Sequence, residues 1–577
     1  MVRNFLQKGK AILYGRQASI VSAATVIMIM IAASRLLGLV RNRVFVHFFA
    51  PEQLDTYLAA FQLPDLIFEV LVLGAMSSAF IPVFTRSLAQ NKGKEGWYLA
   101  GLTMNILFLF FLGLSSLIFI FAHPLYRAIA QGFTPSQIEQ TVFFTRILLI
   151  AQMFFTLSYV FTAALESNQR FLAPAVAPLF YNIGIIVSTI FFAPRFGLIA
   201  SVWGAVAGSF LHVLVQAPLA VSLGFRPVFS LDFRNPALRK IGKLAAPRIL
   251  ELSSFQIKRL VDLFLASLVV GGLTYFKFAD SVAVLPISLF GLSIAKASLP
   301  QLSLKAEQST FEDFKNTFAS SFRQILFFVL PASIFLSVLR TPIVRLVFGG
   351  AQFDWQDTVQ TGYVLSGFAL GIFAYALSLL VSRAFYALHD TVTPVKVSFI
   401  TISINIGLGF LFVLGLGLPI WSLALSYSLA GIVQFVILFV LLSKRIGSFS
   451  EQGLVSTFFK VVASAFTAGT LMFFLLKVMD RAAWDKKLSF LGQLGLAPPT
   501  TFDKFVLDTR YTVNLVILTF LVGLVGLGIY VAVAHVLGVR ELGPVLKVVR
   551  RVSFRRPLFV RPEEKTEAVV PSHVNGE

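Results

Sequence analysis

Arginines, lysines and aspartates stand inside stretches of this chain that are otherwise apolar. Arg35 and Arg41 lie in the first such stretch, and Lys258, Asp262 and Lys277 lie in two stretches further along. A guanidinium or ammonium group in apolar surroundings can bind an anionic compound, and arginine engages phosphate or carboxylate groups through several donors at once. A carboxylate in such a place holds a cation or neutralises a nearby base. The residue types therefore indicate a binding site for a charged compound.

Residues that could carry out catalysis are scattered along the chain. Cysteine is absent, which excludes disulfides, thiolate metal sites and thiol nucleophiles. No glycine-rich phosphate loop follows a strand, and the carboxylates Asp354, Asp357, Asp503 and Asp508 do not form a convincing cluster for Mg²⁺. The six histidines lack metal-ligand spacing; they are His47, His123, His212, His389, His535 and His573. We therefore expect a protein that is not an enzyme.

The elements that position the charged residues are predicted to be membrane-spanning helices. Of the 577 residues, 57% are apolar and 13% are charged, and the mean hydropathy is +0.83. A soluble domain could not bury so much apolar surface. Uncharged runs such as 99–122 and 512–535 exceed the roughly 20 residues that cross the ~30 Å hydrocarbon layer. A charge at the centre of such a helix costs about 2.5 to 3.5 kcal/mol, so it usually faces a cavity, a partner or an interface.

Apolar segments between charged, proline or glycine breaks predict about fourteen transmembrane helices. Their approximate ranges are 19–49, 54–86, 97–122, 139–166, 171–193, 198–223, 237–270, 273–303, 317–348, 358–388, 393–415, 418–443, 453–479 and 511–537. The expected fold is therefore an all-α polytopic membrane protein. Lys and Arg number 48 against 27 Asp and Glu, a net charge of +21. This excess lies mostly in loops and tails, as the positive-inside rule requires, and does not indicate nucleic acid.

Basic connections set the expected orientation. With the N-terminus inside, the basic loops 86–94, 226–243, 305–315 and 444–445 and the tail fall in the cytoplasm, where we expect both termini. Residues 481–510 carry three lysines yet fall outside, although charge bias is less decisive late in a chain. The basic start of the chain resembles a secretory signal, but apolar residues continue past Arg35 to Ala50, which favours a retained first helix.

The chain carries one pattern twice, and this duplication is typical of transporters. Four landmarks recur at separations of 217 to 223 residues: Thr56-Tyr57 as Thr274-Tyr275, Gly74 and Pro82 as Gly291 and Pro300, Asn182-Ile183-Gly184 as Asn405-Ile406-Gly407, and Gln216 as Gln434. Six helices per copy give both halves the same orientation, with a pseudo-twofold axis along the membrane normal and a cavity between them. The predicted division is a basic N-terminus (1–18), an N-terminal six-helix lobe (19–223), a C-terminal six-helix lobe (224–443), two additional transmembrane helices (444–537) and a basic cytoplasmic tail (538–577).

The spacing of the intramembrane charges leaves two interpretations open at two places. Arg35 and Arg41 are six residues apart and point about 120° from each other, so they need not serve one ligand. Arg41 and Asp55 lie near the outer end of the first hairpin, where either a structural ion pair or a binding role is consistent. Lys258 and Asp262 share one helix face through i,i+4 spacing, either as a self-neutralising stripe or as a water-lined face whose Asp262 binds a coupling cation.

Several motifs resemble those of one family, the MurJ (MviN) lipid II flippases, across most of residues 20–445. The N-terminal signature comprises Ser34-Arg35-Leu36-Leu37-Gly38, Arg41, Asp55, Leu63-Pro64, Gly74-Ala75, Ser77, Ala79-Phe80 and Pro82. Residues 383–395 resemble the connection between the family's tenth and eleventh helices, and residues 346–354 are similar as well. The resemblance implies membership of the multidrug/oligosaccharidyl-lipid/polysaccharide exporter superfamily, with fourteen helices, alternating access and a place in the bacterial plasma membrane.

The cargo that the resemblance implies is the undecaprenyl-diphosphate-linked glycopeptide precursor of peptidoglycan, moved from the inner to the outer leaflet. Its diphosphate would explain buried arginines. The substrate-binding candidates are Arg35, Arg41, Asp55, Arg248, Lys258 and Lys277. The gating or ion-coupling candidates are Asp262, Asn405, Asp280 and Arg383. Two cationic positions of the family are missing, since Phe68 lies in an acidic run on the second helix and Ser281 follows Asp280. Lys258, Lys277 or Arg248 is the expected replacement.

No organic cofactor is expected. Relatives that hold sodium make Asp262 and Asn405 candidate ligands for a sodium ion, and coupling to the membrane potential is the alternative. Expected partners besides the cargo are anionic membrane lipids, contacted by the basic tail, and the cell-wall synthesis machinery. The competing functions are export of another undecaprenyl-linked glycan, a multidrug or cation antiporter of the same superfamily, and a non-transporting scaffold. Intramembrane charge that is mostly basic favours an anionic cargo.

Overall fold

The computed structural model describes residues 20–74, 76–89, 93–307, 311–481, 506–509 and 511–543. These residues are almost wholly helical, and the two bridges among them, Gly350 with Phe353 and Asp480 with Leu507, are isolated. The predicted N-terminal segment 1–18 and most of the tail 538–577 lie outside the described residues, as does most of the lysine-bearing loop 481–510. The all-α membrane fold predicted from hydropathy is confirmed.

The first half contains six spanning segments, of which the second is built from several short helices. Their bounds are α2 (Ile20–Phe48), then α3 (Pro51–Ala60), α4 (Gln62–Ile67), η1 (Phe68–Leu73), η2 (Met76–Phe80) and α5 (Ile81–Ala89), followed by α6 (Gly93–Ile129), α7 (Pro135–Ser167), α8 (Leu172–Phe196) and α9 (Ile199–Ser222). The η elements are π-helical turns, in which the hydrogen-bond ladder is widened by one residue.

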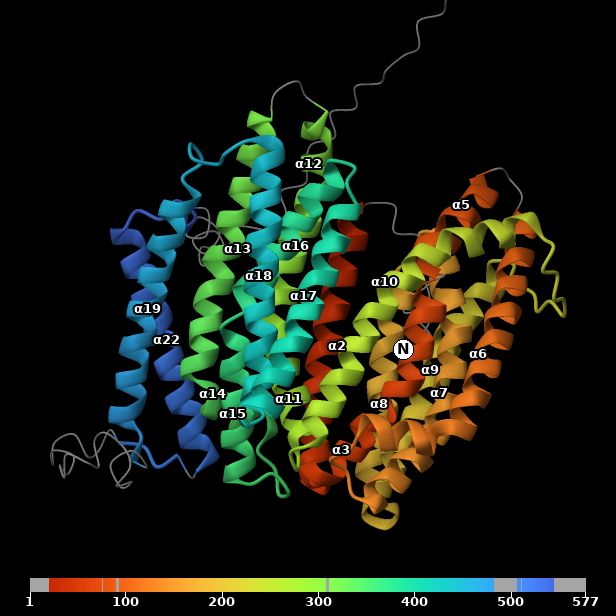
Figure 1. Cartoon of the computed structure of the whole chain (residues 1–577), viewed down its shortest axis with the longest axis horizontal. Coiled ribbons are helices and arrows are strands. Elements are labelled where there is room, and N and C mark those ends of the chain that lie inside the picture. The colour runs from red at the N-terminus through yellow and green to blue at the C-terminus, as the bar shows by residue number, and fades with distance from the viewer. Residues whose placement is uncertain are drawn as a thin grey trace, which may run out of the picture.

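The second half repeats this order and adds two helices. It comprises α10 (Pro236–Ser267), α11 (Gly272–Pro286), η3 (Ile287–Leu292), α12 (Ser293–Ala306), α13 (Glu312–Val338), α14 (Arg340–Phe348), α15 (Trp355–Ala369), α16 (Ile372–Ala387), α17 (Val392–Phe410), η4 (Leu411–Gly415) and α18 (Trp421–Ile446). The additional helices are α19 (Leu454–Met479) and α22 (Thr512–Val536). They pack on each other and on α13, at the edge of the second half (Figure 1).

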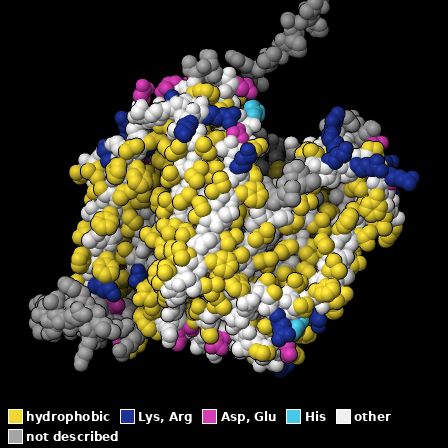
Figure 2. Space-filling view, in the orientation of Figure 1, with side chains coloured by type: hydrophobic (Ala, Val, Ile, Leu, Met, Phe, Trp, Pro, Cys, Tyr) yellow, Lys and Arg dark blue, Asp and Glu magenta, His cyan; other side chains and the backbone are white. Residues whose placement is uncertain are grey.

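Apolar side chains cover the flank of the molecule, and charged side chains gather at its two ends (Figure 2). Phe191 and Phe520, for example, are 70% and 67% exposed, which is the expected pattern where lipid replaces water around a helix bundle. Twelve helices among the described residues are long and apolar enough to span a membrane. The other two predicted spans correspond to α2 and α10, whose interiors carry charged residues.

Five spans that were predicted as continuous helices are interrupted. The second span, predicted over 54–86, contains η1 and η2; the eighth, over 273–303, contains η3; and the eleventh, over 393–415, ends in η4. The ninth, over 317–348, breaks at Leu339 and restarts as α14, and the tenth, over 358–388, divides into α15 and α16. Pro64 precedes η1, and Pro286 directly precedes η3. Since proline removes a backbone donor and crowds the preceding turn, the helix relaxes locally. Pro342 lies in the first turn of α14, where a missing N–H costs nothing.

The π-helical turns η1 and η3 lie at equivalent positions in the two copies of the repeat. They begin at residues 68 and 287 and end at residues 73 and 292, a displacement of 219 residues at both ends. This displacement falls within the range of the shared sequence landmarks. The two copies therefore share a local distortion of the backbone as well as a sequence pattern.

Helices α8 and α9 approach each other closely through glycines. A Cβ on Gly184 would lie 2.6 Å from the Cα of Gly208, and a Cβ on Gly208 would lie 2.5 Å from the Tyr181 carbonyl oxygen. Gly204 and Gly208 form the small-xxx-small pattern that lets helices in a membrane pack backbone to backbone. The Ser188 hydroxyl donates to the Ala200 carbonyl oxygen at 2.6 Å across the same contact. This helix pair can accept no larger side chain at its centre.

Helix α10 runs obliquely between the two groups of helices (Figure 1). It packs against α4, η1, η2 and α6 of the first half, and against α11, α17 and α18 of the second. The sequence assigns this helix to the second lobe, and the boundary at residue 223 stays a prediction. Its position places the charges of α10 opposite residues of both halves.

Candidate functional site

Glu69 of η1 is held by two side chains of α10. The Arg259 Nη1 atom lies 2.6 Å from Glu69 Oε1, and the Gln256 Nε2 atom donates to Glu69 Oε2 at 2.7 Å. Gln256 is 3% exposed, whereas the side chains of Arg259 and Glu69 are 38% and 23% exposed. Both carboxylate oxygens are therefore occupied, in a place that a solute can still reach.

The same part of α10 carries a second ion pair. The Lys258 ammonium lies 2.6 Å from Asp262 Oδ2, and both side chains are largely buried. Lys258 also lies 4.9 Å from the centre of the Tyr427 ring, which stacks on Tyr375 at 4.3 Å. Of the two interpretations left open for this helix face, the geometry supports the self-neutralising stripe in the present conformation.

Three charged residues near these pairs have no geometric partner. Within the described residues, the side chains of Arg35 on α2 and of Lys277 and Asp280 on α11 form no hydrogen bond or ion pair. Their charges nevertheless act on one another and on the neighbouring pairs: Lys277 interacts with Asp280, Asp262, Arg259 and Lys258, and Asp280 also interacts with Arg35. An unpaired charge inside a membrane protein usually faces a cavity or a ligand.

These residues together form the central charged cluster, which lies where the two halves meet. Its members are Arg35, Asp65, Glu69, Lys258, Arg259, Asp262, Lys277 and Asp280. Asp65 of α4 accepts a hydrogen bond from Gln152 and lies within range of the charges of Glu69, Arg259 and Lys277. The expectation that intramembrane charge is mostly basic does not describe this cluster, in which carboxylates and cations are equal in number.

Arg41 lies apart from the other substrate-binding candidates. Its Nη1 atom donates to Asn182 Oδ1 at 3.2 Å, its Nε atom donates to Asn42 Oδ1 at 3.4 Å, and its guanidinium lies 5.8 Å from the Phe45 ring centre. All of these partners belong to the first half. Arg41 is therefore held within its own half.

Asp55 joins the two halves at the end of the bundle that is predicted to face outside. Its buried carboxylate accepts two hydrogen bonds from Thr274, one from the backbone N–H and one from the hydroxyl, both at 2.7 Å. The Thr274 hydroxyl also donates to the Pro51 carbonyl oxygen at 3.0 Å. No ion pair joins Asp55 to Arg41 among the described residues. The geometry gives Asp55 a role in contact between the halves.

A second contact closes the same end of the bundle. Arg43 donates to the carbonyl oxygens of Arg345 and Leu346 at 3.3 and 3.1 Å, and the Gln352 backbone N–H donates to the Val46 carbonyl oxygen at 3.0 Å. These bonds join the end of α2 to α14 and the loop that follows it. Any opening at this end must break them together with the Asp55 contact.

Of the four ion-coupling candidates, Asp262 and Asp280 belong to the central charged cluster, whereas Asn405 and Arg383 contact residues outside it. The Asn405 amide donates to the Ser426 hydroxyl at 3.3 Å, and Arg383 lies over the Tyr386 ring at 5.6 Å. The Lys258 ammonium already lies 2.6 Å from Asp262 Oδ2 and neutralises this carboxylate. Asp262 and Asn405 as placed here therefore do not fit sodium, and we derive no step through it. Coupling to sodium or to the membrane potential stays a prediction.

The expected replacements for the missing family cations behave differently from one another. The Lys258 ammonium is neutralised by its ion pair with Asp262, and the Lys277 side chain is unpaired among the described residues. The side chain of Arg248 on α10 lies outside the described residues. The Ser281 hydroxyl donates to the Phe278 carbonyl oxygen of its own helix. Sequence reasoning missed Arg259 as the residue that faces the second helix. Two features of the sequence could have indicated this contact: Glu69 stands next to Phe68, where the family has a cation, and α10 carries the additional arginine Arg259. The two residues are 190 positions apart in the sequence, so nothing paired them.

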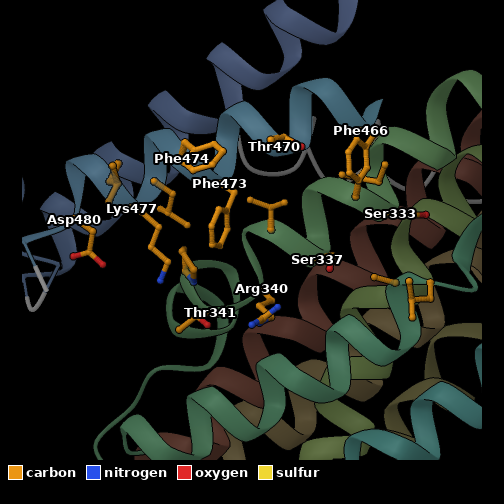
Figure 3. Close-up of a pocket in the computed structure, with 18 of the residues that line it drawn as sticks. Ser333, Ser337, Arg340, Thr341, Phe466, Thr470, Phe473, Phe474, Lys477 and Asp480 are labelled. Carbon is orange, nitrogen blue, oxygen red and sulfur yellow. The ribbon is translucent and has the colours of Figure 1, made fainter. Parts of the chain in front are cut away.

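A largely apolar cavity of about 830 Å³ lies between α13, α14, α16, α19 and α22. Figure 3 shows Phe466, Phe473 and Phe474 of α19 along it, and Arg340 and Lys477 among the other lining residues. None of the site residues predicted from the sequence lines this cavity. A cavity of this composition inside a membrane protein suits a hydrocarbon chain.

Comparison with known proteins identifies the family. A family model described as "Lipid II flippase MurJ" matches residues 46–493. A probable lipid II flippase MurJ of Bdellovibrio bacteriovorus is 28% identical over 378 residues, which cover 64% of this chain and 72% of that protein.

Two solved structures resemble the fold. One is the lipid II flippase MurJ in an inward closed conformation, with a TM-score of 0.70 and 22% identity over 92% of this chain and 100% of that chain. The other is a multidrug resistance transporter of the MATE family in an inward-facing conformation, with a TM-score of 0.61 and 15% identity over 72% of this chain and 96% of that chain. Because the family model spans most of the sequence, this chain belongs to the lipid II flippase MurJ family.

Proposed function

We propose that this protein moves lipid II, the lipid-linked precursor of peptidoglycan, from the inner to the outer leaflet of the bacterial plasma membrane. Membership of the flippase family supports the cargo. One structural observation carries the proposal: Arg35 and Lys277 lie where the halves meet, and neither has a hydrogen bond or ion pair among the described residues. Unpaired cations in such a place are suited to an anionic headgroup.

Alternating access follows from the contacts between the halves. In the present conformation the Asp55 contact with Thr274 and the Arg43 contact with Leu346 close the end predicted to face outside. Cargo enters from the cytoplasmic side, its diphosphate meets Arg35 and Lys277, and release requires the outer contacts to break. The apolar cavity beside α13, α19 and α22 offers the polyprenyl chain a place within the protein. Both termini lie in the cytoplasm in this scheme.

A cation antiporter is the second candidate. The MATE-like fold and the carboxylates of the central charged cluster, above all the unpaired Asp280, favour it. An antiporter would bind a cationic compound through Asp280 and would not need Arg35. Contacts with cell-wall enzymes and with anionic lipids are further proposals, which belong to the first candidate.

The decisive experiment is flipping of lipid II by the purified full chain in proteoliposomes, together with complementation of a bacterium depleted of its own lipid II flippase. We expect the intact chain to flip lipid II and to sustain growth, and Arg35→Ala to lose both. Failure of a well-inserted intact chain in both assays would reject lipid II as cargo. Transport of a cationic dye that survives Arg35→Ala and is lost in Asp280→Asn would establish the antiporter instead.

A further inference from the structure

We propose that Gln256 and Arg259 form an anion-binding subsite for the diphosphate of the cargo, and that Glu69 occupies this subsite while cargo is absent. The inference rests on the proposed function and adds a regulatory residue to it. Glu69 competes with the cargo for the donors of Gln256 and Arg259. An anionic headgroup must displace Glu69 before η1 and α10 can separate.

The geometry is that of a bound anion. Gln256 and Arg259 are three residues apart and share one face of α10, and each donates to a different oxygen of the Glu69 carboxylate. Gln256 is 3% exposed, so its amide is fixed in place. The greater exposure of Arg259 and Glu69 gives a ligand access to the same donors.

A diphosphate can use these donors better than Glu69 does. Arginine binds carboxylate and phosphate oxygens with the same planar set of donors. Glu69 brings one negative charge, but the charges of Arg259 and Lys277 act on each other, so more than one cation is available. A diphosphate carries enough charge and enough acceptors to neutralise both, and it would restore each hydrogen bond that Glu69 gives up.

Displacement of Glu69 has a mechanical consequence because the ion pair joins separate parts of the bundle. Glu69 belongs to η1 of the first half, whereas α10 also packs on α17 of the second. The position in η3 that corresponds to Glu69 at a displacement of 219 is Ser288, so the second copy has no such competitor. Cargo without a strongly anionic headgroup would leave the pair closed, and the pair therefore selects for diphosphate.

The test measures binding of inorganic pyrophosphate to the full chain in detergent, with variants that separate the two roles. Glu69→Gln keeps the shape and removes the competing charge. We expect it to bind pyrophosphate about tenfold tighter, because a charged hydrogen bond is worth about 1.5–3 kcal/mol and each 1.4 kcal/mol is tenfold. Arg259→Gln should bind about tenfold more weakly, by the same estimate. The double variant should resemble Arg259→Gln alone.

A carboxylate elsewhere in the same half provides the matched control. The carboxylate of Glu166 on α7 has no hydrogen bond or ion pair among the described residues, and Glu166→Gln should leave pyrophosphate affinity unchanged. If Glu69→Gln cannot be recovered folded, Glu69→Ser, which copies the residue of η3, replaces it with the same expected gain. Equal affinity of the wild type and the folded Glu69 variant overturns the role of Glu69, and equal affinity after Arg259→Gln overturns the subsite.

Lipid II flipping in the same preparations separates this inference from the proposed function. A chain that gains pyrophosphate affinity on Glu69→Gln but does not flip lipid II would keep the subsite and reject the cargo. A chain that flips lipid II with unchanged affinity in both variants would keep the cargo and reject the subsite.

Discussion

The two halves use the same dipeptide for different purposes. Thr56 of the first half donates to the Gln53 carbonyl oxygen at 2.7 Å and to Gln140 Oε1 at 3.2 Å, within its own half. Its counterpart Thr274 donates to Asp55 and Pro51 of the opposite half. The threonine is thus a hydrogen-bond donor in both copies. In the first copy its acceptors lie in the same half, and in the second they lie in the opposite half, so only Thr274 joins the two halves.

The repeated asparagines show the same divergence. Asn182 accepts a hydrogen bond from Arg41, whereas Asn405 donates to Ser426 and touches no charged group among the described residues. The unshared charges follow this division, since Arg35 comes from the first copy and Lys277 from the second. The functional asymmetry of the molecule therefore arises from partners that the duplication did not copy.

Of the changes that test this asymmetry between the halves, Arg35→Ala should have the largest effect on lipid II flipping. We expect lipid II flipping to fall about a hundredfold, because charge-assisted hydrogen bonds to a diphosphate worth ~3 kcal/mol are lost. Flipping rates in proteoliposomes measure this change. Arg146→Ala removes an arginine of the same half whose guanidinium donates to the Phe119 carbonyl oxygen and lies over the Phe119 ring, and it should leave flipping nearly intact. Equal rates in the two variants would contradict a role for Arg35 in cargo binding.

Asp55→Ala should open the end of the bundle that it closes. The change leaves the Thr274 N–H without its acceptor, at about 1–3 kcal/mol for one buried group, and shifts the conformational equilibrium, while the Thr274 hydroxyl keeps the Pro51 carbonyl oxygen as its acceptor. Spin labels on cysteines placed at the exposed residues Glu52 and Gln356 report the distance, and the natural chain has no cysteine to interfere. Thr56→Val, the matched change within one half, should leave the distance distribution unchanged. A broadening in both variants would show that the two copies are equivalent after all.

Substitution of the two repeated asparagines, Asn182 and Asn405, should change the flipping rate by a smaller factor. Asn182→Leu removes an acceptor from Arg41 and should slow flipping by roughly fivefold, in line with about 1 kcal/mol for one hydrogen bond. Asn405→Leu should slow flipping less, because its partner Ser426 carries no charge. Flipping rates in sodium and potassium buffers measure both effects. A sodium-dependent loss confined to Asn405→Leu would restore the sodium site that the present conformation does not form.

The smallest effect concerns the loop between α16 and α17. Burial raises the pKa of Asp390, but hydrogen bonds from Thr393 and Val392 and the Arg445 guanidinium at 2.5 Å outweigh it and hold the pKa below its usual value. A lowered pKa in the folded state adds stability above the unfolded pKa, which is lost as pH falls through the folded pKa. Asp390→Asn should therefore lower the melting temperature slightly at pH 7, with the difference vanishing in acid. A difference that persists in acid would contradict this origin.

Hydropathy predicted the all-α fold, repetition predicted the parallel repeats, and the resemblance of short motifs predicted the family, because each depends on residue types along one segment. The π-turns and the break at Leu339 depend on a few prolines whose effect varies with packing. The contact of Glu69 with Arg259 escaped prediction because helical spacing shows which face a charge occupies and not which distant face lies opposite. The cavity beside α19 was missed for a similar reason, since an apolar residue that lines a cavity has the same sequence pattern as one that faces lipid.

The glycine contact between α8 and α9 bears on how the molecule can move. Helices that meet backbone to backbone can neither slide nor rotate without collision, so α8 and α9 move together as one rigid unit. Bending must then concentrate where the backbone ladder is already widened, which makes η1 and η3 the natural hinges. Glu69 lies in one of these hinges. Sensing of the headgroup and bending of the protein are thereby located in a single turn of helix.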